Sequence, residues 1–135
     1  MSMDQELREI ATRGMANNLG IEILEITPDR VVATMPVDTR TRQPFGILHG
    51  GASVALAETV ASLGAVGRID RDKFVAVGQE INANHLRGIS DGVVTATAVP
   101  VHVGRASQVW AVEIRDEAQR LVCVSRCTLA VVEKR

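Results

Sequence analysis

Aromatic residues are scarce in this sequence, and neither sign of charge dominates. Phe, Trp and Tyr together make up 2% of the 135 residues, and the formal net charge is −1. Proteins that bind single-stranded nucleic acid stack the bases on aromatic side chains, and proteins that bind duplexes or anionic membranes present a basic surface. The composition therefore argues against a nucleic-acid partner and against a membrane partner.

Long hydrophobic runs are also missing. The longest apolar run, near residues 52–66, is interrupted by Glu58 and is too short to span a bilayer. The opening residues, MSMDQELREIATRG, carry charges from the fourth position and lack the apolar segment of a signal peptide. We therefore expect a soluble cytoplasmic protein.

Cysteine is nearly absent as well. The sequence has two cysteines, Cys123 and Cys127. On a strand their Cα atoms would lie roughly 13 Å apart, which is too far for a disulfide. We expect both to be small core residues, and we expect neither a metal site nor another cofactor.

The size and balance of the chain indicate a single domain. Hydrophobic residues make up 46% of the sequence and charged residues 23%, which is typical of a globular protein with one core. Hydrophobic periodicity predicts a helix over 4–16, a β-hairpin over 20–37, a polar loop over 38–48 and a helix over 50–66. One domain is expected over residues 1–135.

Four more strands are predicted after the second helix, at 74–86, 92–103, 107–115 and 121–132. Because short turns join them, we expect an antiparallel meander in which each strand pairs with the next. The helix over 50–66 is apolar on nearly every side, which predicts burial. The predicted fold class is α+β: a six-stranded antiparallel sheet wrapped around one long central helix, with a short N-terminal helix.

One carboxylate lies within the apolar stretch LHGGASVALAET, at Glu58. A buried carboxylate is uncommon unless it is paired with a base or used in chemistry. Arg87 and Arg105 are the candidate structural partners. The alternative is that Glu58 is a catalytic group, and both interpretations stay open on this pattern alone.

A possible oxyanion site precedes Glu58. Gly50 and Gly51 occupy the first positions of the predicted helix, where backbone N–H groups lack internal partners and the helix dipole is positive. Glycine allows a ligand oxygen to approach that backbone closely, and His49 is placed to donate to the same oxygen or to orient a neighbour. Gly-Gly pairs also occur in ordinary turns, so this signal is weak by itself.

The spacing between these groups predicts a shared site. Gly50 and Glu58 are eight residues apart, about 12 Å along a helix, whereas a nucleophile and an oxyanion donor must converge on one carbonyl. If both serve one reaction, the carboxylate must come from a second copy of the chain, across a two-fold axis. Ser62, one turn beyond Glu58, is placed either to hold a water beside the carboxylate or to bond back to the helix.

The stretch QPFGILHGGASVALAETVAS, together with INANHLRG and VHVGRASQVWAVEIRDEAQRLVCVSRCTLAVV, resembles hotdog-fold acyl-CoA thioesterases. The similar branch includes the hydroxybenzoyl-CoA, dihydroxynaphthoyl-CoA and phenylacetate-pathway enzymes. The resemblance extends from about Asn18 to Val132 and implies an enzyme that hydrolyses an aryl-type acyl-CoA to the free acid and CoA. It also implies a homodimer as the catalytic unit and a homotetramer as the assembly.

The resemblance implies roles for five residues at the reacting bond. Glu58 would act as nucleophile or general base, and the Gly50 N–H would polarise the thioester carbonyl. Gln43 and His49 would position the thioester or the water. A hydroxyl at Ser62 would assist the carboxylate.

Other roles concern the two ends of the substrate. His85 would line the acyl pocket, and we expect Phe45, Leu48 and Gly51 to contact the acyl group. Leu86 and Gly88 depart from the residues expected beside His85, so the shape of this pocket is open. The cations expected to bind the CoA phosphates are Arg87 and Arg105, the latter with Gly104 before it.

Three other functions are the alternatives. A broad-range medium- or long-chain fatty acyl-CoA thioesterase needs only a different pocket. A dehydratase or hydratase is disfavoured because no Asp follows His49 at short spacing. A non-catalytic acyl-CoA-binding module would have no need of Glu58.

Overall fold

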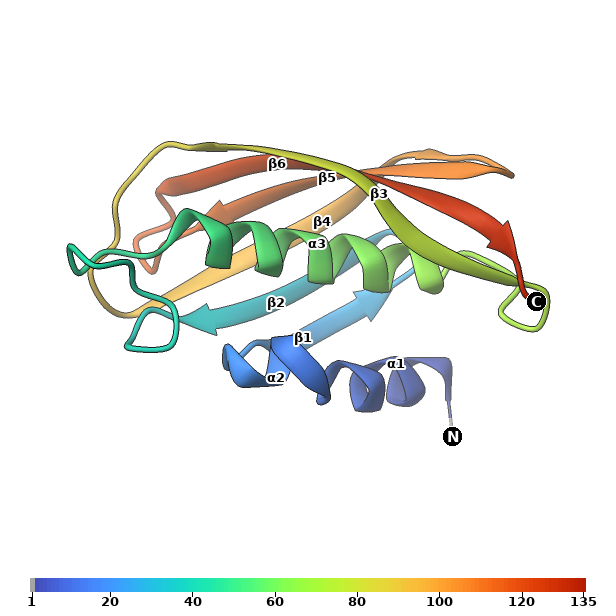
Figure 1. Ribbon diagram of the computed structural model, residues 1–135, viewed down its shortest axis with the longest axis horizontal. Coiled ribbons are helices and arrows are strands. Elements are labelled where there is room, and N and C mark those ends of the chain that lie inside the picture. Colours follow the sequence, from blue (N-terminus) through green and yellow to red (C-terminus); the bar gives the residue numbers. More distant parts are fainter. Residues whose placement is uncertain (1) are drawn as a thin grey trace.

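The computed structural model describes residues 2–135 and consists of one curved sheet around one long helix (Figure 1). This architecture confirms the predicted fold class. None of the helices in the described part of the chain is long and apolar enough to cross a membrane. The helices are α1 (Met3–Ala11), α2 (Gly14–Asn18) and α3 (Gly50–Val66), and the strands are β1 (Glu22–Thr27), β2 (Arg30–Pro36), β3 (Phe74–His85), β4 (Val93–Val103), β5 (Ser107–Arg115) and β6 (Leu121–Glu133).

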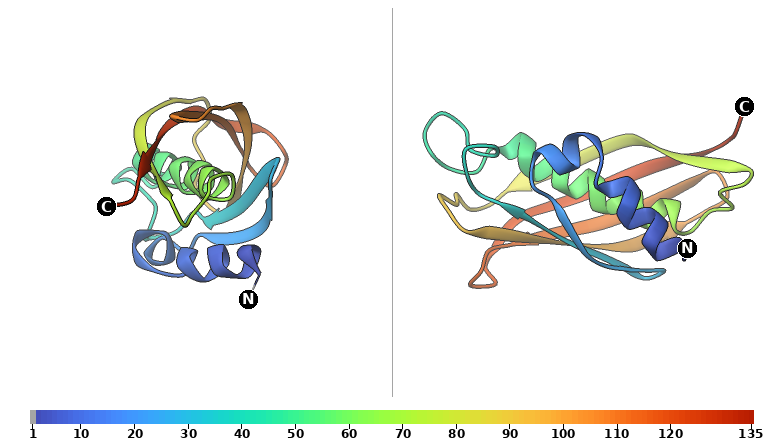
Figure 2. Two further views of the ribbon diagram at one scale, coloured as in Figure 1. Left: turned by 90° about the vertical axis from the view of Figure 1, so that its right-hand side faces the viewer. Right: turned by 90° about the horizontal axis from the view of Figure 1, so that it is seen from below.

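The single N-terminal helix predicted over 4–16 is wrong, because two short helices occupy this region. Ser2 begins α1 with a capping box, in which its side chain accepts from the Gln5 N–H while the Gln5 side chain accepts from the Ser2 N–H. Gly14 has a φ of +70°, a left-handed conformation that a continuous helix does not allow. The chain therefore turns at this point, and α1 and α2 lie beside β1 (Figure 2).

The predicted meander is partly wrong. The strand order is β1-β2-β4-β5-β6-β3, so β4, β5 and β6 form a meander but β3 pairs with β6 and not with β4. The seven residues from Leu86 to Gly92 carry the chain across to β4, which pairs with β2. Seven extended residues span up to about 25 Å, enough to cross the roughly 14 Å taken by three strand spacings.

This order leaves β3 at one end of the sheet. Within residues 2–135 no strand pairs with its outer edge. Val75 and Val77 on this strand are 37% and 47% exposed. A long strand with one unpaired edge is a surface on which another chain can add.

Helix α3 lies on the concave side of the sheet, as Figure 2 shows end-on. Its buried positions include Leu56, Ala57, Val60 and Ala61, each 0% exposed, which confirms the expected burial. Trp110 of β5 holds the helix close. A Cβ at Gly64 would approach the Trp110 ring within 2.7 Å, so only glycine allows this contact.

The Trp110 contact includes a buried hydrogen-bonded pair. The indole N–H donates to Gln108 Oε1 at 2.8 Å, and the Gln108 amide donates to the carbonyls of Ala65 and Arg68 at 3.4 Å. Both side chains are 0% exposed. Since buried polar groups need partners, this pair fixes the C-terminal end of α3 against β5.

Candidate active site

Two clefts flank α3, and most of the predicted site residues are divided between them. The first, the Gly50 cleft, has a volume of about 400 Å³ and lies at the start of the helix. It is lined by Gln43, Ile47, Leu48, Gly50, Ser53, His85, Leu86, Arg87, Gly88 and Val122.

The second, the Glu58 cleft, has a volume of about 490 Å³ and lies between α3 and the N-terminal helices. It is lined by Ile10, Ala11, Arg13, Met15, Ala16, Gly51, Val54, Ala55, Glu58, Thr59, Ser62 and Leu63.

Gly50 provides an available donor at the start of α3. The N–H of Gly51 donates to the His49 side chain at 2.7 Å, and those of Ala52 and Ser53 donate to the His49 carbonyl at 3.0 and 3.2 Å. Among residues 2–135 the Gly50 N–H has no such partner. Because it lies at the positive end of the helix and lines a cleft, it is suited to hold a ligand oxygen.

His49 is the N-cap of α3. Its Nδ1 accepts the hydrogen bond from Gly51, so in the neutral ring Nε2 carries the proton. The ring is thus oriented by the helix that it caps, and Nε2–H remains as an outward donor. Sequence analysis expected His49 to donate to the substrate oxygen or to orient a neighbour; its observed contact is the cap on α3, and both roles stay predictions.

Gln43 is oriented in a similar way. Its Oε1 accepts a short hydrogen bond from the Phe45 N–H, and this leaves the amide NH₂ as the end able to donate into the Gly50 cleft. Phe45 itself is 91% exposed and lines neither cleft within one chain. Its predicted contact with the acyl group is therefore not made by the single subunit.

His85 and Leu48 lie where an acyl group beside Gly50 would extend. A Cβ on Gly50 would approach His85 Nε2 within 2.9 Å, so the imidazole packs directly over the helix start. Leu48 is 8% exposed and Val122 2%, and both line the same cleft. The walls of the Gly50 cleft are thus largely apolar at depth, as a hydrophobic acyl group requires.

Glu58 lies on the other side of α3, half-buried against β3. A Cβ on Gly78 would come within 2.6 Å of Glu58 Oε2, so the carboxylate rests on the bare backbone of this strand. The sheet register shifts just after Gly78, which marks a bulge. None of the ion pairs formed among residues 2–135 includes Glu58, so the pairing with Arg87 or Arg105 is not made.

Ser62 lies beside Glu58 in the same cleft. Thr59 donates back to the Ala55 carbonyl at 2.7 Å, the bond typical of a hydroxyl within a helix. No hydrogen bond of this kind is formed by Ser62 in the part of the chain described. Its hydroxyl is therefore available to a water or ligand next to the carboxylate.

The two cysteines are buried beneath the site, as predicted. Both are free and 0% exposed. Burial raises the pKa of the Cys123 thiol. Burial, with a further contribution from the negative charges of Glu58 and Glu80, raises the pKa of Cys127 to about 11. The thiols are thus neutral near pH 7 and unsuited to nucleophilic chemistry.

The two arginines expected at the CoA phosphates do not meet within one chain. Arg87 follows β3 and lines the Gly50 cleft. Arg105 follows Gly104 in the turn after β4, where the Ala106 carbonyl accepts from the Val131 N–H. Val131 pairs with Ala76 near the start of β3, whereas His85 at its end pairs with Cys123. The two guanidinium groups therefore lie toward opposite ends of the sheet.

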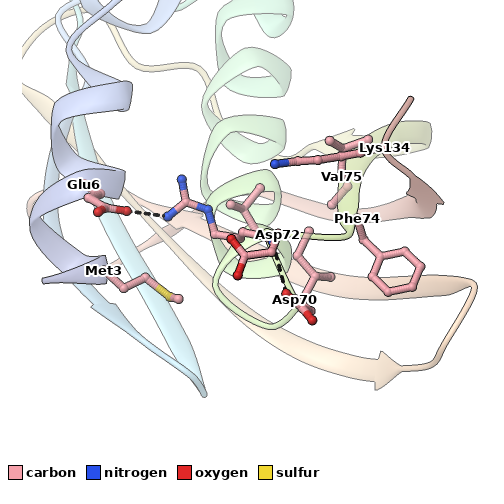
Figure 3. Close-up of a pocket in the computed structure, with 11 residues that line it drawn as sticks. Met3, Glu6, Asp70, Asp72, Phe74, Val75 and Lys134 are labelled. Carbon is pink, nitrogen blue, oxygen red and sulfur yellow. Dashed lines mark hydrogen bonds and ion pairs between the residues drawn. The ribbon is translucent and has the colours of Figure 1, made fainter.

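The largest cleft, about 810 Å³, lies elsewhere (Figure 3). It is formed beyond the C-terminal end of α3, and none of the predicted site residues lines it. Arg71 there pairs with Glu6 at 2.9 Å, and Asp70 accepts from the Asp72 backbone N–H at 3.0 Å. Size alone would select this cleft, but the available donor and the unpaired carboxylate are beside the two smaller ones.

A family model described as the thioesterase superfamily matches residues 45–123, the segment that includes both Gly50 and Glu58. The chain belongs to the thioesterase superfamily. It is 61% identical over 116 residues to the Bacillus subtilis (strain 168) protein ComA2, covering 86% of this chain and 92% of the relative. It is 48% identical over 122 residues to a 1,4-dihydroxy-2-naphthoyl-CoA hydrolase of Listeria monocytogenes, covering 90% of this chain and 98% of the relative.

A crystal structure of the Haemophilus influenzae thioesterase HI1161 superposes with a TM-score of 0.90 at 47% identity, covering 98% of this chain and 92% of that one. The present chain is therefore a thioesterase, an enzyme that hydrolyses thioesters, and its fold is the hotdog fold of that superfamily. The expected family and enzyme class are confirmed.

Two residues at the site were missed by sequence analysis. Ser53 lines the Gly50 cleft one helical turn from Gly50, and Gly78 lies against Glu58. The signal for Gly78 was present in the sequence, since an isolated glycine within a strand pattern indicates a bulge or a close approach. For Ser53 the spacing of three from Gly50 put both on one helix face.

Proposed function

We propose that this thioesterase hydrolyses an aryl-CoA thioester at a site completed by two subunits. The thioester oxygen accepts from the Gly50 N–H of one subunit, and Glu58 of the other acts at the carbonyl carbon. The C–S bond breaks, CoA leaves as the thiol, and water supplies the oxygen of the free acid. Glu58 either attacks to form an anhydride or removes a proton from the water.

The observation that carries this proposal is the separation of the two groups within one chain. Gly50 and Glu58 line different clefts, on two sides of one helix. Along the α3 axis they are about 12 Å apart. One subunit therefore has an oxyanion donor without a nucleophile and a carboxylate without a donor. Each is supplied by a second copy related by a two-fold axis.

The edge strand supports such a dimer. If two β3 strands pair in antiparallel fashion across the two-fold axis, the His85 end of one lies beside the Phe74 end of the other. The same pairing draws Arg87 of one subunit toward Arg105 of the other, which places two cations on one CoA. A tetramer formed from two such dimers is the assembly we propose.

The aryl specificity rests on the Gly50 cleft and on one relative. Leu48, Val122 and the His85 ring provide flat and apolar surfaces beside the proposed carbonyl site. The Listeria monocytogenes relative is named for a naphthoyl-CoA substrate. A panel of aryl- and fatty-acyl-CoAs, compared by kcat/KM, tests this choice directly, and a preference for the fatty acyl esters would contradict it.

The catalytic role is tested with Glu58→Gln and Glu58→Ala. Release of free CoA is followed with Ellman's reagent, which also separates hydrolysis from a hydration that liberates no thiol. Both variants should lose nearly all turnover of benzoyl-CoA-type substrates. Near wild-type turnover in either one would exclude Glu58 as the catalytic carboxylate.

The shared site is tested by mixing subunits. A subunit with Glu58→Gln is combined with one carrying Gly50→Pro, which lacks the backbone N–H. If the site spans two chains, half of the dimers are mixed and each has one intact site, so about a quarter of wild-type activity returns. If the site lies within one chain, the mixture stays as inactive as its parents.

A further inference from the structure

Ser53 is the most deeply buried residue of the Gly50 cleft, and its hydroxyl has no assigned task. The residue is 1% exposed, while Leu48 and Val122 beside it are 8% and 2% exposed. These three form the floor of the cleft, below Gly50 and the exposed ends of His85 and Arg87. The floor is thus apolar except for one hydroxyl.

The Ser53 hydroxyl also has no partner in the folded chain. Its backbone N–H donates to the His49 carbonyl at 3.2 Å, but Oγ takes part in no hydrogen bond among residues 2–135. In the same helix the Thr59 hydroxyl is satisfied by the Ala55 carbonyl. Ser53 Oγ is not among the fully enclosed side-chain atoms of the described chain that lack a partner, which are Asp4 Oδ1 and Ser125 Oγ, so it is open to the cleft. A hydroxyl left open at the floor of a largely apolar cleft needs an explanation.

The direction of the side chain supplies that explanation. In an α-helix the Cα–Cβ bond leans toward the N-terminus, so Ser53 leans toward the turn that begins at Gly50. A thioester whose oxygen accepts from the Gly50 N–H would extend its acyl group into the same cleft. Its far end then meets Leu48, Val122 and the Ser53 hydroxyl.

We propose that Ser53 is a specificity-determining residue, whose hydroxyl hydrogen-bonds to a hydroxyl substituent on the acyl group. This rests on the proposed function, and it narrows the substrate to hydroxylated aryl thioesters. The serine oxygen both donates and accepts, so it matches a substituent that does the same. An unsubstituted ring leaves the buried hydroxyl unpaired, and the site therefore disfavours it.

The test uses Ser53→Ala with benzoyl-CoA and its 2-, 3- and 4-hydroxy isomers. Wild-type enzyme should prefer at least one hydroxy isomer by about tenfold in kcat/KM over benzoyl-CoA. The variant should lose this preference through a fall of about tenfold in kcat/KM for the preferred hydroxy isomer. An equal loss on every substrate would overturn the proposal, because it would place Ser53 at the thioester or the water. So would an unchanged preference.

Ser125→Ala is the matched control. This serine is also buried at 8% exposed, its Oγ also has no partner in the described structure, and it lines neither cleft. It should leave the preference unchanged. Thermal unfolding provides a second readout: removal of an unpartnered hydroxyl should leave the Tm of Ser53→Ala equal or higher, whereas a serine needed for the fold would lower it.

Binding measurements test the role of Ser53 independently of turnover. The thioether analogues phenacyl-CoA and its hydroxyphenacyl isomers retain the carbonyl but cannot be hydrolysed, and their Kd values are measured by calorimetry. If wild-type binds a hydroxy isomer about tenfold more tightly and Ser53→Ala does not, the inference stands even where turnover is absent and the proposed function fails. Turnover with equal Kd values across the series overturns the inference alone, and failure of every analogue to bind overturns it as well.

Discussion

The two clefts beside α3 contain opposite halves of one chemistry. The Gly50 cleft holds donors: the free Gly50 N–H and the Gln43 amide. The Glu58 cleft holds a carboxylate without a basic partner among the described residues, next to the Ser62 hydroxyl. A carboxylate within reach of its own oxyanion donor would accept that hydrogen bond and block it. Separation on two sides of one helix keeps both groups available.

Apart from the loss of Glu58 itself, the largest expected effect concerns the donor of the Gly50 cleft. Gly50→Pro removes the N–H, and proline suits the first position of a helix. His49 before it has φ −70° and ψ 131°, a conformation that precedes proline readily. Loss of an oxyanion donor should lower kcat about 10²- to 10³-fold.

Gly50→Ala is the control for that change, measured by the same kcat assay. It places the same Cβ 2.9 Å from His85 Nε2 but keeps the N–H. If alanine and proline reduce kcat equally, the effect comes from crowding of His85, and the Gly50 N–H is not the donor.

The next effect concerns the position of the carboxylate. Gly78→Ala introduces a Cβ 2.6 Å from Glu58 Oε2, so the carboxylate must shift while the fold needs little adjustment. A displacement of about 1 Å can lower turnover up to about 100-fold, so we expect the turnover rate to fall at least about tenfold while KM changes little.

Gly67→Ala provides the comparison for the Gly78 variant. A Cβ at Gly67 meets its nearest atoms at 3.5 Å, an ordinary contact, and Gly67 caps the C-terminal end of α3 and lines neither cleft. Steady-state kinetics on both variants, with circular dichroism to confirm folding, decides the matter. Unchanged kcat in Gly78→Ala would mean that Glu58 is not held by this strand.

A smaller effect is expected for Ser62→Ala. The hydroxyl has no back-bond within the described chain and assists Glu58 only through a water or ligand. Its removal should lower kcat about threefold to tenfold, the value of roughly one hydrogen bond, without altering the fold. A stopped-flow or plate assay of CoA release measures it, and an increase in kcat would contradict the assignment.

The smallest effect concerns the pKa values of the two cysteines. Cys127 has its pKa raised to about 11 by burial together with Glu58 and Glu80, while burial alone raises the pKa of Cys123. Glu58→Gln should therefore lower the pKa of Cys127 and leave that of Cys123 unchanged. Thiolate absorbance near 240 nm, recorded in Cys123→Ala and Cys127→Ala backgrounds, gives the pKa of the remaining cysteine. If Glu58→Gln shifts the pKa values of the two cysteines equally, the charge of Glu58 does not act specifically on Cys127.

The raised pKa of Cys127 also predicts how the free energy of unfolding changes with pH. The ordinary thiol value is 9.0, so the neutral Cys127 stabilises the fold fully below that pH. This contribution is lost as the pH rises from about 9 to about 11. The free energy of unfolding should fall over this range, and less steeply in Cys127→Ala, as measured by urea titration.

Sequence analysis predicted the elements better than their arrangement. Strand β5 was predicted with the bounds that the structure has, and α3 likewise, because apolar periodicity and the Gly-Gly at its start are local signals. The predicted pairing of β3 with β4 was wrong, since β3 pairs with β6, because a turn signal indicates where a strand ends but not which strand lies beside it. Gly14 was overlooked as the break between α1 and α2, since helical spacing on both sides concealed it.

By itself the sequence determined the family and the buried helix and singled out the proposed carboxylate and donor, because these depend on residue type and short spacing along the chain. Only the tertiary structure decided that Gly50 and Glu58 lie in different clefts, that Gly78 supports the carboxylate and that Ser53 has no partner. These are contacts between strands and helix faces distant in sequence. Their geometry follows from how the sheet curves around α3, which no local pattern specifies.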